Sequence, residues 1–205
     1  MSYDQIALPA AYCDTLETAV AHLEAQADRP PTPEAAALAA RVEEGCGDVL
    51  SVSPLAAQGD TVAVPVTFRG VARAREVVHT EARAAGFGIV DPQLGVVFDP
   101  RAALPGRIIT PDGELATLTA AAVAHLVGAL RVDDFLVVTT EDEQVYAQTY
   151  RRSATHFDVE RREGGPDRHF GTSATSADEV RALLDAWLRG EASVVERTTW
   201  ERIEL

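Results

Sequence analysis

The chain holds five histidines, and one of them stands where acid-base chemistry could take place. His169 follows Asp167 and Arg168 directly after a glycine-rich turn at 163–167, at the start of an expected strand. An acid, a cation and an imidazole could converge there on a small ligand. The alternative is that Arg168 pairs with a neighbouring carboxylate and His169 simply occupies a strand. Packing or surface roles are expected for three histidines that fall within helices: His22, His79 and His125.

Two acidic runs flank an expected strand at 135–140. They comprise Asp133 and Asp134 before the strand, and Glu141, Asp142 and Glu143 after it. Several carboxylate oxygens can bind Ca²⁺, but no D-x-D-x-D-G loop accompanies them, and acidic residues at a hairpin tip commonly form a solvated turn. We therefore predict no metal site. The runs instead form a candidate partner-binding surface, to which three aromatic anchors could contribute: Tyr146, Tyr150 and Trp200.

Common catalytic signatures are missing from the sequence. The chain contains no lysine, which excludes the G-x-x-x-x-G-K-[ST] phosphate-binding loop, and it has no G-x-S-x-G or H-E-x-x-H motif. Gly86 and Gly88 follow an expected helix and precede a strand, the reverse of the order in a dinucleotide-binding fingerprint. We predict that the protein is not an enzyme and binds no cofactor.

The net charge is strongly negative. The 18 basic residues, all arginine, and 32 acidic residues give a net charge of −14. Residues 1–105 hold seven arginines against 14 acids, and residues 106–205 hold 11 against 18. Such a field repels nucleic acid and anionic lipid and attracts cationic proteins, so we expect a basic partner and no nucleic acid. Plain solubility is the alternative explanation of this charge.

Composition is that of a folded protein that needs no disulfide. Hydrophobic residues make up 46% of the 205 residues and charged residues 24%, which is enough apolar material for a core. Cys13 and Cys46 have no C-x-x-C spacing and are expected to be free thiols. The N-terminus lacks the pattern of a signal peptide, and no apolar run is long enough to span a membrane. We therefore expect a cytoplasmic protein.

The first part of the chain predicts an α+β domain over residues 1–104. Strands are expected at 3–8, 62–68, 87–90 and 95–98, and helices at 16–27, 33–45 and 71–85, in the order βααβαββ. A capping box at 14–17 opens the first helix, whose predicted apolar face is Leu16, Val20 and Leu23. Prolines and glycines at 99–113 indicate a linker, which we place at 105–116.

The second part predicts another α+β domain over residues 117–205. A helix is expected at 117–130, followed by strands at 135–140, 144–150, 156–162 and 168–173. A capping box at 176–179 opens a helix that should lie across the sheet, and an edge strand is expected at 199–205. The order is αββββα plus a C-terminal strand. The predicted fold class is thus α+β with two small domains, the second an antiparallel β-meander packed against flanking helices.

Short motifs in the second part resemble a bacterial domain family. Residues 132–205 carry D-F-L-V-V at 134–138, Y-A-Q-T-Y at 146–150, D-R-H-F at 167–170 and a closing W-E-R-I-E-L. They are similar to an actinobacterial family associated with immunity-type proteins of polymorphic toxin systems. The first 100 residues resemble another uncharacterised bacterial domain, although Ala7 and Val90 stand where that domain has aromatic residues. The resemblance implies a non-enzymatic protein that neutralises a toxin.

Three functional hypotheses remain open from the sequence. In the first, an immunity protein masks the active site of a cognate basic toxin through the acidic runs and the three aromatic anchors. In the second, a sensor or enzyme binds a small molecule near Arg168 and His169. In the third, the chain is a scaffold or a chaperone-like adaptor. The oligomeric state does not follow from the sequence.

Overall fold

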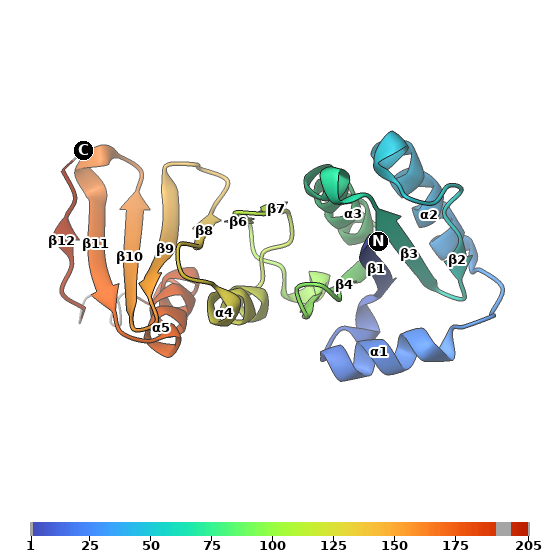
Figure 1. Cartoon of the computed structure of the whole chain (residues 1–205), viewed down its shortest axis with the longest axis horizontal. Helices are drawn as coiled ribbons and strands as arrows, with labels where there is room; N and C mark the ends of the chain where they lie inside the picture. Colours follow the sequence, from blue (N-terminus) through green and yellow to red (C-terminus); the bar gives the residue numbers. More distant parts are fainter. Residues whose placement is uncertain (1, 192–197, 205) are drawn as a thin grey trace. The chain divides into compact units, whose positions relative to one another are not determined.

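The structure is a computed structural model that describes residues 2–191 and 198–204, and its elements form two compact units (Figure 1). The first unit runs to Ala103 and includes Asp112–Thr119. The second holds Leu104–Pro111 and the chain from Ala120 onwards. Helices and two antiparallel sheets alternate along the described residues, which confirms the predicted α+β class with a meander.

The first unit is built on an antiparallel sheet with the strand order β2-β3-β1-β4-β5. The strands are β1 (Tyr3–Pro9), β2 (Ala57–Gln58), β3 (Thr61–Val66), β4 (Phe87–Asp91) and β5 (Val96–Phe98). Pro65 lies in β3, which has a neighbouring strand on each side, β2 and β1. The two-residue strand β2, which the sequence pattern did not predict, takes the edge position.

Three helices cover this sheet from two sides (Figure 1). They are α1 (Leu16–Ala25), α2 (Pro33–Cys46) and α3 (Val71–Ala84). The last two pack against each other, and buried valines of β3 lie beneath them. On the opposite face α1 contributes Ala19 to a small core with Leu8, Cys13 and Val90.

The predicted apolar face of the first helix is only partly correct. Leu23 is half-buried against that core, but Leu16 and Val20 are 39% and 42% exposed. The side chains that α1 buries are Ala19 and His22. The buried face of α1 therefore differs from the predicted one. His22 is held against the first unit because its ring stacks on Tyr12 and its Nε2 pairs with the carboxylate of Asp60.

The second unit contains the meander, with strands side by side in the order β12-β11-β10-β9-β8-β6 (Figure 1). The strands are β6 (Arg107–Thr110), β8 (Phe135–Thr139), β9 (Val145–Ser153), β10 (His156–Glu163), β11 (His169–Ala174) and β12 (Glu201–Arg202). Helices α4 (Ala120–Ala129) and α5 (Ala177–Leu188) pack together and against these strands. Because buried and half-buried residues alternate along the strands, one face of the sheet meets the helices.

The linker prediction for 105–116 needs correction. Residues 104–111 belong to the second unit and form β6, which pairs with β8, whereas residues 112–119 belong to the first unit, where β7 (Gly113–Leu115) packs against α3. Helix α4 consequently starts at Ala120 and not at Thr117. The prolines and glycines of this segment mark turns between strands. None of the described helices is long and apolar enough to cross a membrane.

Candidate functional site

The face of the second sheet that points away from its helices brings several predicted site residues together. Strand register places three rows across it: Thr139, Tyr146, Arg162 and His169; Val137, Gln148, Glu160 and Gly171; Phe135, Tyr150, Asp158 and Ser173. Most of these side chains are half-buried, which is typical of a sheet face that has no helix over it. We call this surface the open face.

A histidine-carboxylate pair lies at one end of the open face. Nε2 of His169 is 3.0 Å from Oε2 of Glu160 and 3.5 Å from the hydroxyl of Tyr146. The same carboxylate oxygen accepts a hydrogen bond of 2.7 Å from the amide of Gln148. The imidazole is 5% exposed, and its Nδ1 is buried without a hydrogen-bond partner among the described residues. Glu160 and Tyr146 therefore orient the ring directly, and Gln148 holds the carboxylate of Glu160.

Glu160 is the residue that sequence reasoning missed. It lies in a strand whose extent was predicted well, but its relevance depends on the register that places it diagonally opposite His169. Alternation along β10 already puts Asp158, Glu160 and Arg162 on one face. Only the pairing of β10 with β11 shows that this face is also the face of His169.

A groove of about 510 Å³ adjoins this pair. Its polar lining comes from strands β10, β11 and β12 and includes Asp158, Glu160, Ser173, Glu201 and Arg202. Ile203 bounds it as well, since its side chain lies over Gly171, where a Cβ atom would stand 3.0 Å from Ile203 Cδ1. Glu160 of the pair lines the groove, whereas His169 does not.

Arg168 does not join His169 in the convergent arrangement, which is one of the two alternatives that the sequence left open. Its guanidinium is exposed and donates from Nη2 to Glu163 at 2.7 Å. This pairing with a neighbouring carboxylate is the structural alternative that the sequence left open. The polar partners of His169 are instead Glu160 and Tyr146.

The five predicted acidic residues lie at the two opposite ends of β8. At one end, Asp133 accepts a 3.0 Å hydrogen bond from Tyr150, which raises the pKa of that tyrosine, and Asp134 accepts from the backbone of Arg131. At the other end, Glu143 pairs with Arg107 at 2.8 Å. The remaining two are exposed in the β8–β9 turn: Glu141 and Asp142. They do not form a single cluster.

The three predicted aromatic anchors divide between the two faces of the sheet. Tyr146 and Tyr150 lie on the open face, and Arg152 packs 4.4 Å above the ring of Tyr150. Trp200 contacts Arg161, at 4.9 Å from its guanidinium carbon. Because Arg161 alternates with Glu160 and Arg162, it points to the other face. Trp200 therefore cannot share a contact surface with the two tyrosines.

The first unit buries a separate polar cluster between its sheet and α3. The hydroxyl of Tyr3 donates to Asp91, and Arg75 donates to that hydroxyl from Nη2 at 2.5 Å. Burial raises the pKa of both Tyr3 and Asp91. His79 lies edge-on to Phe98, and burial lowers its pKa to about 3, so the imidazole is neutral. This cluster is inaccessible to solvent and serves the fold.

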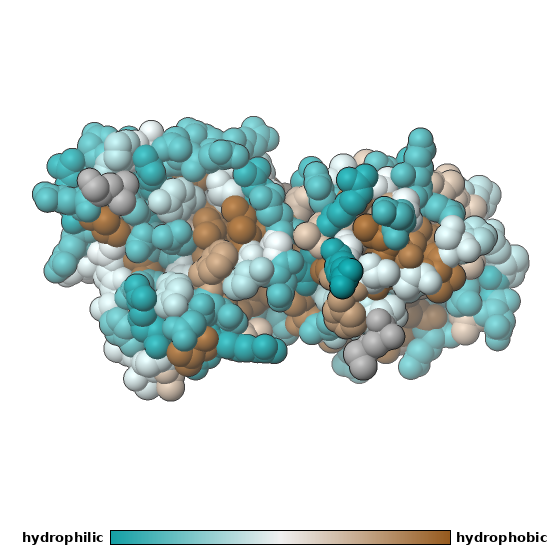
Figure 2. Space-filling view, turned by 45° about the horizontal axis from the view of Figure 1, so that its top comes forward, coloured by the Kyte–Doolittle hydropathy of each residue, from teal (hydrophilic) through white to brown (hydrophobic). Residues whose placement is uncertain are grey.

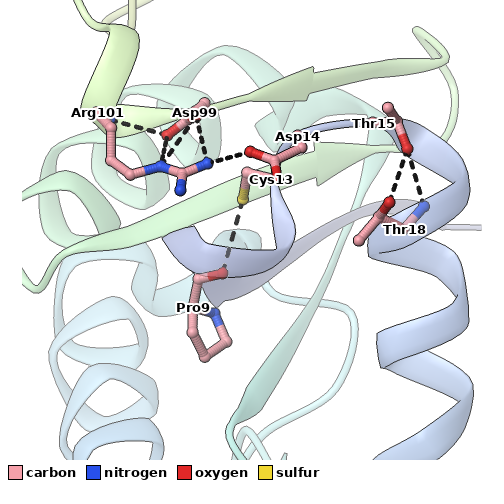
Figure 3. A network of polar contacts seen from close by, with 7 residues as sticks. All are labelled: Pro9, Cys13, Asp14, Thr15, Thr18, Asp99 and Arg101. Carbon is pink, nitrogen blue, oxygen red and sulfur yellow. Dashed lines mark hydrogen bonds and ion pairs between the residues drawn. The ribbon is translucent and has the colours of Figure 1, made fainter.

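A second polar network ties the start of α1 to the end of the sheet (Figure 3). Arg101 donates to Asp14 at 2.6 Å and to both oxygens of Asp99. Beneath it, the thiol of Cys13 lies 3.8 Å from the backbone oxygen of Pro9. The side chain of Thr15 caps α1 through the backbone of Thr18. The exposed ion pairs lie next to a buried thiol, and these contacts hold the start of α1 to the sheet.

No set of three or more described His, Cys, Asp or Glu residues has an arrangement that could hold a metal ion. Hydrophilic side chains dominate the visible face of each unit, and apolar residues reach the surface in patches within each of them (Figure 2). No protein-family model, curated protein or solved structure matches this chain.

Proposed function

We propose that the protein is a non-enzymatic binding protein of the immunity type, which masks the active site of a basic toxin in the cytoplasm. One observation carries this proposal: Tyr146 and Tyr150 lie on one open face together with Glu160 and Asp158, with Tyr150 directly opposite Asp158 and Tyr146 opposite Arg162. Aromatic side chains that present both a ring and a hydroxyl are frequent anchors of protein interfaces. Free cysteines agree with a reducing compartment.

The two tyrosine side chains of the open face are already held in place in the unbound protein. Tyr150 is held by Asp133 on one side and by Arg152 on the other, and Tyr146 contacts the ring of His169 edge-on at 5.9 Å. Side chains fixed in this way lose little conformational freedom on association. The net charge of −14 would speed the approach of a cationic partner and oppose acidic competitors.

The test begins with the tagged full chain, purified from its source cells at low salt. We expect a basic protein to copurify, with an association rate that falls as sodium chloride is raised. The double variant Tyr146→Ala, Tyr150→Ala should dissociate at least tenfold faster. Asp178→Asn, an exposed change on α5, is the matched control and should bind as the wild type does. The proposal would be overturned if the association rate did not change with salt and the double tyrosine variant dissociated at the wild-type rate.

A small-molecule site is the second candidate, and the groove beside Glu160 favours it. Small-molecule sites combine a hollow with a few convergent polar groups, and here Glu160 links the groove to the buried imidazole of His169. A screen of metabolites by ligand-observed NMR would test this candidate. A ligand whose binding is lost in Glu160→Gln, but retained in Arg168→Gln, would favour it over masking of a protein partner.

A further inference from the structure

The face of the first sheet that carries α1 is covered over only part of its area. By strand register, Ala63, Ile6, Val90 and Val97 form one row across four strands on this face. Val90 is buried under α1, whereas Ile6 and Val97 are half-buried and Ala63 is exposed. Apolar side chains in a central row of a sheet normally lie beneath a covering element. Ile6 and Val97 also pack against the small core under α1, so the cover is complete over Val90 and partial over Ile6 and Val97, and it leaves Ala63 exposed.

Two further apolar features belong to the same side of the sheet. On α1, Leu16 and Val20 stand one helical turn apart and are 39% and 42% exposed. At the other edge, an apolar groove of about 230 Å³ is lined by Val52, Pro54, Leu55, Ala63 and Pro65. Ala63 belongs to both the row and the groove, so the surface is continuous from β1 to the sheet edge.

Carboxylates border the same surface. Asp4 alternates with Tyr3 and Gln5, so it lies on the α1 side of the sheet next to Ile6. Glu17 and Glu24 are exposed on the flank of α1 beyond Leu16 and Val20. These positions follow from the period of 3.6 residues per turn.

The acidic border belongs to a wider asymmetry of charge. Residues 14–60 hold nine acidic residues against two arginines, whereas the rest of residues 1–105 holds five of each. The whole negative surplus of this half of the chain therefore lies within residues 14–60, where α1 and the residues next to it contribute Asp14, Glu17, Glu24 and Asp28, while the acids of α2 lie on the opposite face of the sheet. Arg29 and Arg41 are the two arginines, and Arg41 already pairs with Glu81 at 2.8 Å. An apolar surface with this border is complementary to a cationic amphipathic partner.

We infer that the α1 side of the first sheet is a docking surface for a basic amphipathic segment of a partner protein. The apolar side of the segment would lie over Leu16, Val20 and Ile6, and its arginines or lysines would face the bordering carboxylates. This surface is separate from the open face of the second unit, and the inference does not depend on the function proposed for that face.

A defined probe tests the inference with the full chain. The probe is a synthetic helical peptide with leucines on one side and arginines on the other, labelled for fluorescence anisotropy. We expect binding that weakens as sodium chloride is raised, and amide NMR shifts that centre on Ile6, Leu16, Val20 and Val97. An analogue with glutamates in place of the arginines should bind at least tenfold more weakly.

Substitutions locate the site. The double variant Leu16→Ser, Val20→Ser should bind the arginine peptide at least tenfold more weakly, because it removes exposed apolar area and leaves the buried Ala19 and His22 of α1 unchanged. Val132→Ser, which changes an exposed valine of the second unit, is the matched control. The double variant Glu17→Gln, Glu24→Gln keeps the apolar area and should reduce the dependence on salt, a readout that does not rely on the serine variants.

Four results would overturn the inference. The first is equal affinity of the serine variant and the wild type, and the second is equal affinity for the arginine and glutamate peptides. The third is concentration-dependent self-association that Leu16→Ser, Val20→Ser abolishes, since a second copy of this chain would then be the occupant. Loss of binding in Tyr146→Ala, Tyr150→Ala with no loss in the serine variant would assign the peptide to the open face, and so would also contradict the inference.

Discussion

The buried guanidinium of Arg75 donates from Nη1 to the backbone oxygen of Asp112 at 3.0 Å. This contact joins α3 to a segment 37 residues further along the chain, after the chain has already contributed β6 to the second unit. A second hydrogen bond from the same guanidinium reaches Tyr3 on β1. One side chain that is 1% exposed therefore holds a helix, a strand and a returning segment together.

Replacement of Arg75 by leucine should destabilise the first unit. The change leaves Tyr3, Asp91 and the Asp112 carbonyl without their buried cation, and loss of one partner from a buried pair typically costs about 3–5 kcal/mol. Urea unfolding should show the loss, and amides of Gly113–Leu115 should exchange faster. Arg69→Leu, at an exposed position, should change stability by less than about 0.5 kcal/mol. Equal stability of the two variants would contradict the structural role of Arg75.

Stability of the first unit should depend on pH through His79. Burial and the nearby guanidinium of Arg75 lower the pKa of this histidine from 6.5 to about 3 in the folded state. Between these values the unfolded chain binds a proton that the folded chain excludes. The stabilising contribution is therefore complete above pH 6.5 and declines by about 1.4 kcal/mol per pH unit as the pH falls towards 3.

Urea midpoints of the wild type and His79→Leu between pH 7.5 and 5 measure this effect above the range in which most carboxylates titrate. The leucine variant should lose most of the slope, whereas His125→Leu, at an exposed position on α4, should keep it. An unchanged slope in His79→Leu would show that other groups produce the pH dependence.

Gly88 on β4 should not tolerate a side chain. A Cβ atom at this position would lie 2.2 Å from the sulfur of Cys13 and 2.8 Å from the backbone oxygen of Phe98. Overpacking of this kind typically costs about 1–3 kcal/mol, so Gly88→Ala should lower the urea midpoint. Adding Cys13→Ala should restore only part of the loss, because the backbone contact remains. Full recovery in the double variant would mean that the sulfur alone fills the space.

Local patterns predicted the elements of this fold better than they predicted its connections. The meander was predictable because polar and apolar residues alternate along each strand and turn residues separate the strands. Ile108 and Ile109 lie among prolines and glycines, and their pairing with Val138 and Val137 depends on strands that come later in the chain. Strand β6 was therefore not predicted, and its residues were assigned to the linker.

The buried polar cluster around Arg75 could have been predicted from the pattern of residues in α3. Val71, Ala74, Arg75, Val78 and Ala82 recur at helical spacing, and Arg75 falls within that apolar face. An arginine on an apolar face indicates a buried partner. The pairing of His169 with Glu160 left no comparable signal, because both residues alternate correctly on their own strands and only the register brings them together.

Cys13 should react slowly with thiol reagents in the folded protein. The side chain is 4% exposed, and burial, with the carboxylate of Asp99 nearby, raises its pKa to about 11. Since the thiolate is the reactive form, modification by Ellman's reagent at pH 8 should be more than tenfold slower than that of a free cysteine, and unfolding in urea should remove the difference. Cys46 is 1% exposed and its pKa is also raised by burial, so the same result is expected for Cys13→Ala, in which Cys46 is the remaining thiol. Rapid modification of the native chain, with the rate set by Cys13, would show that the end of the sheet opens readily around α1.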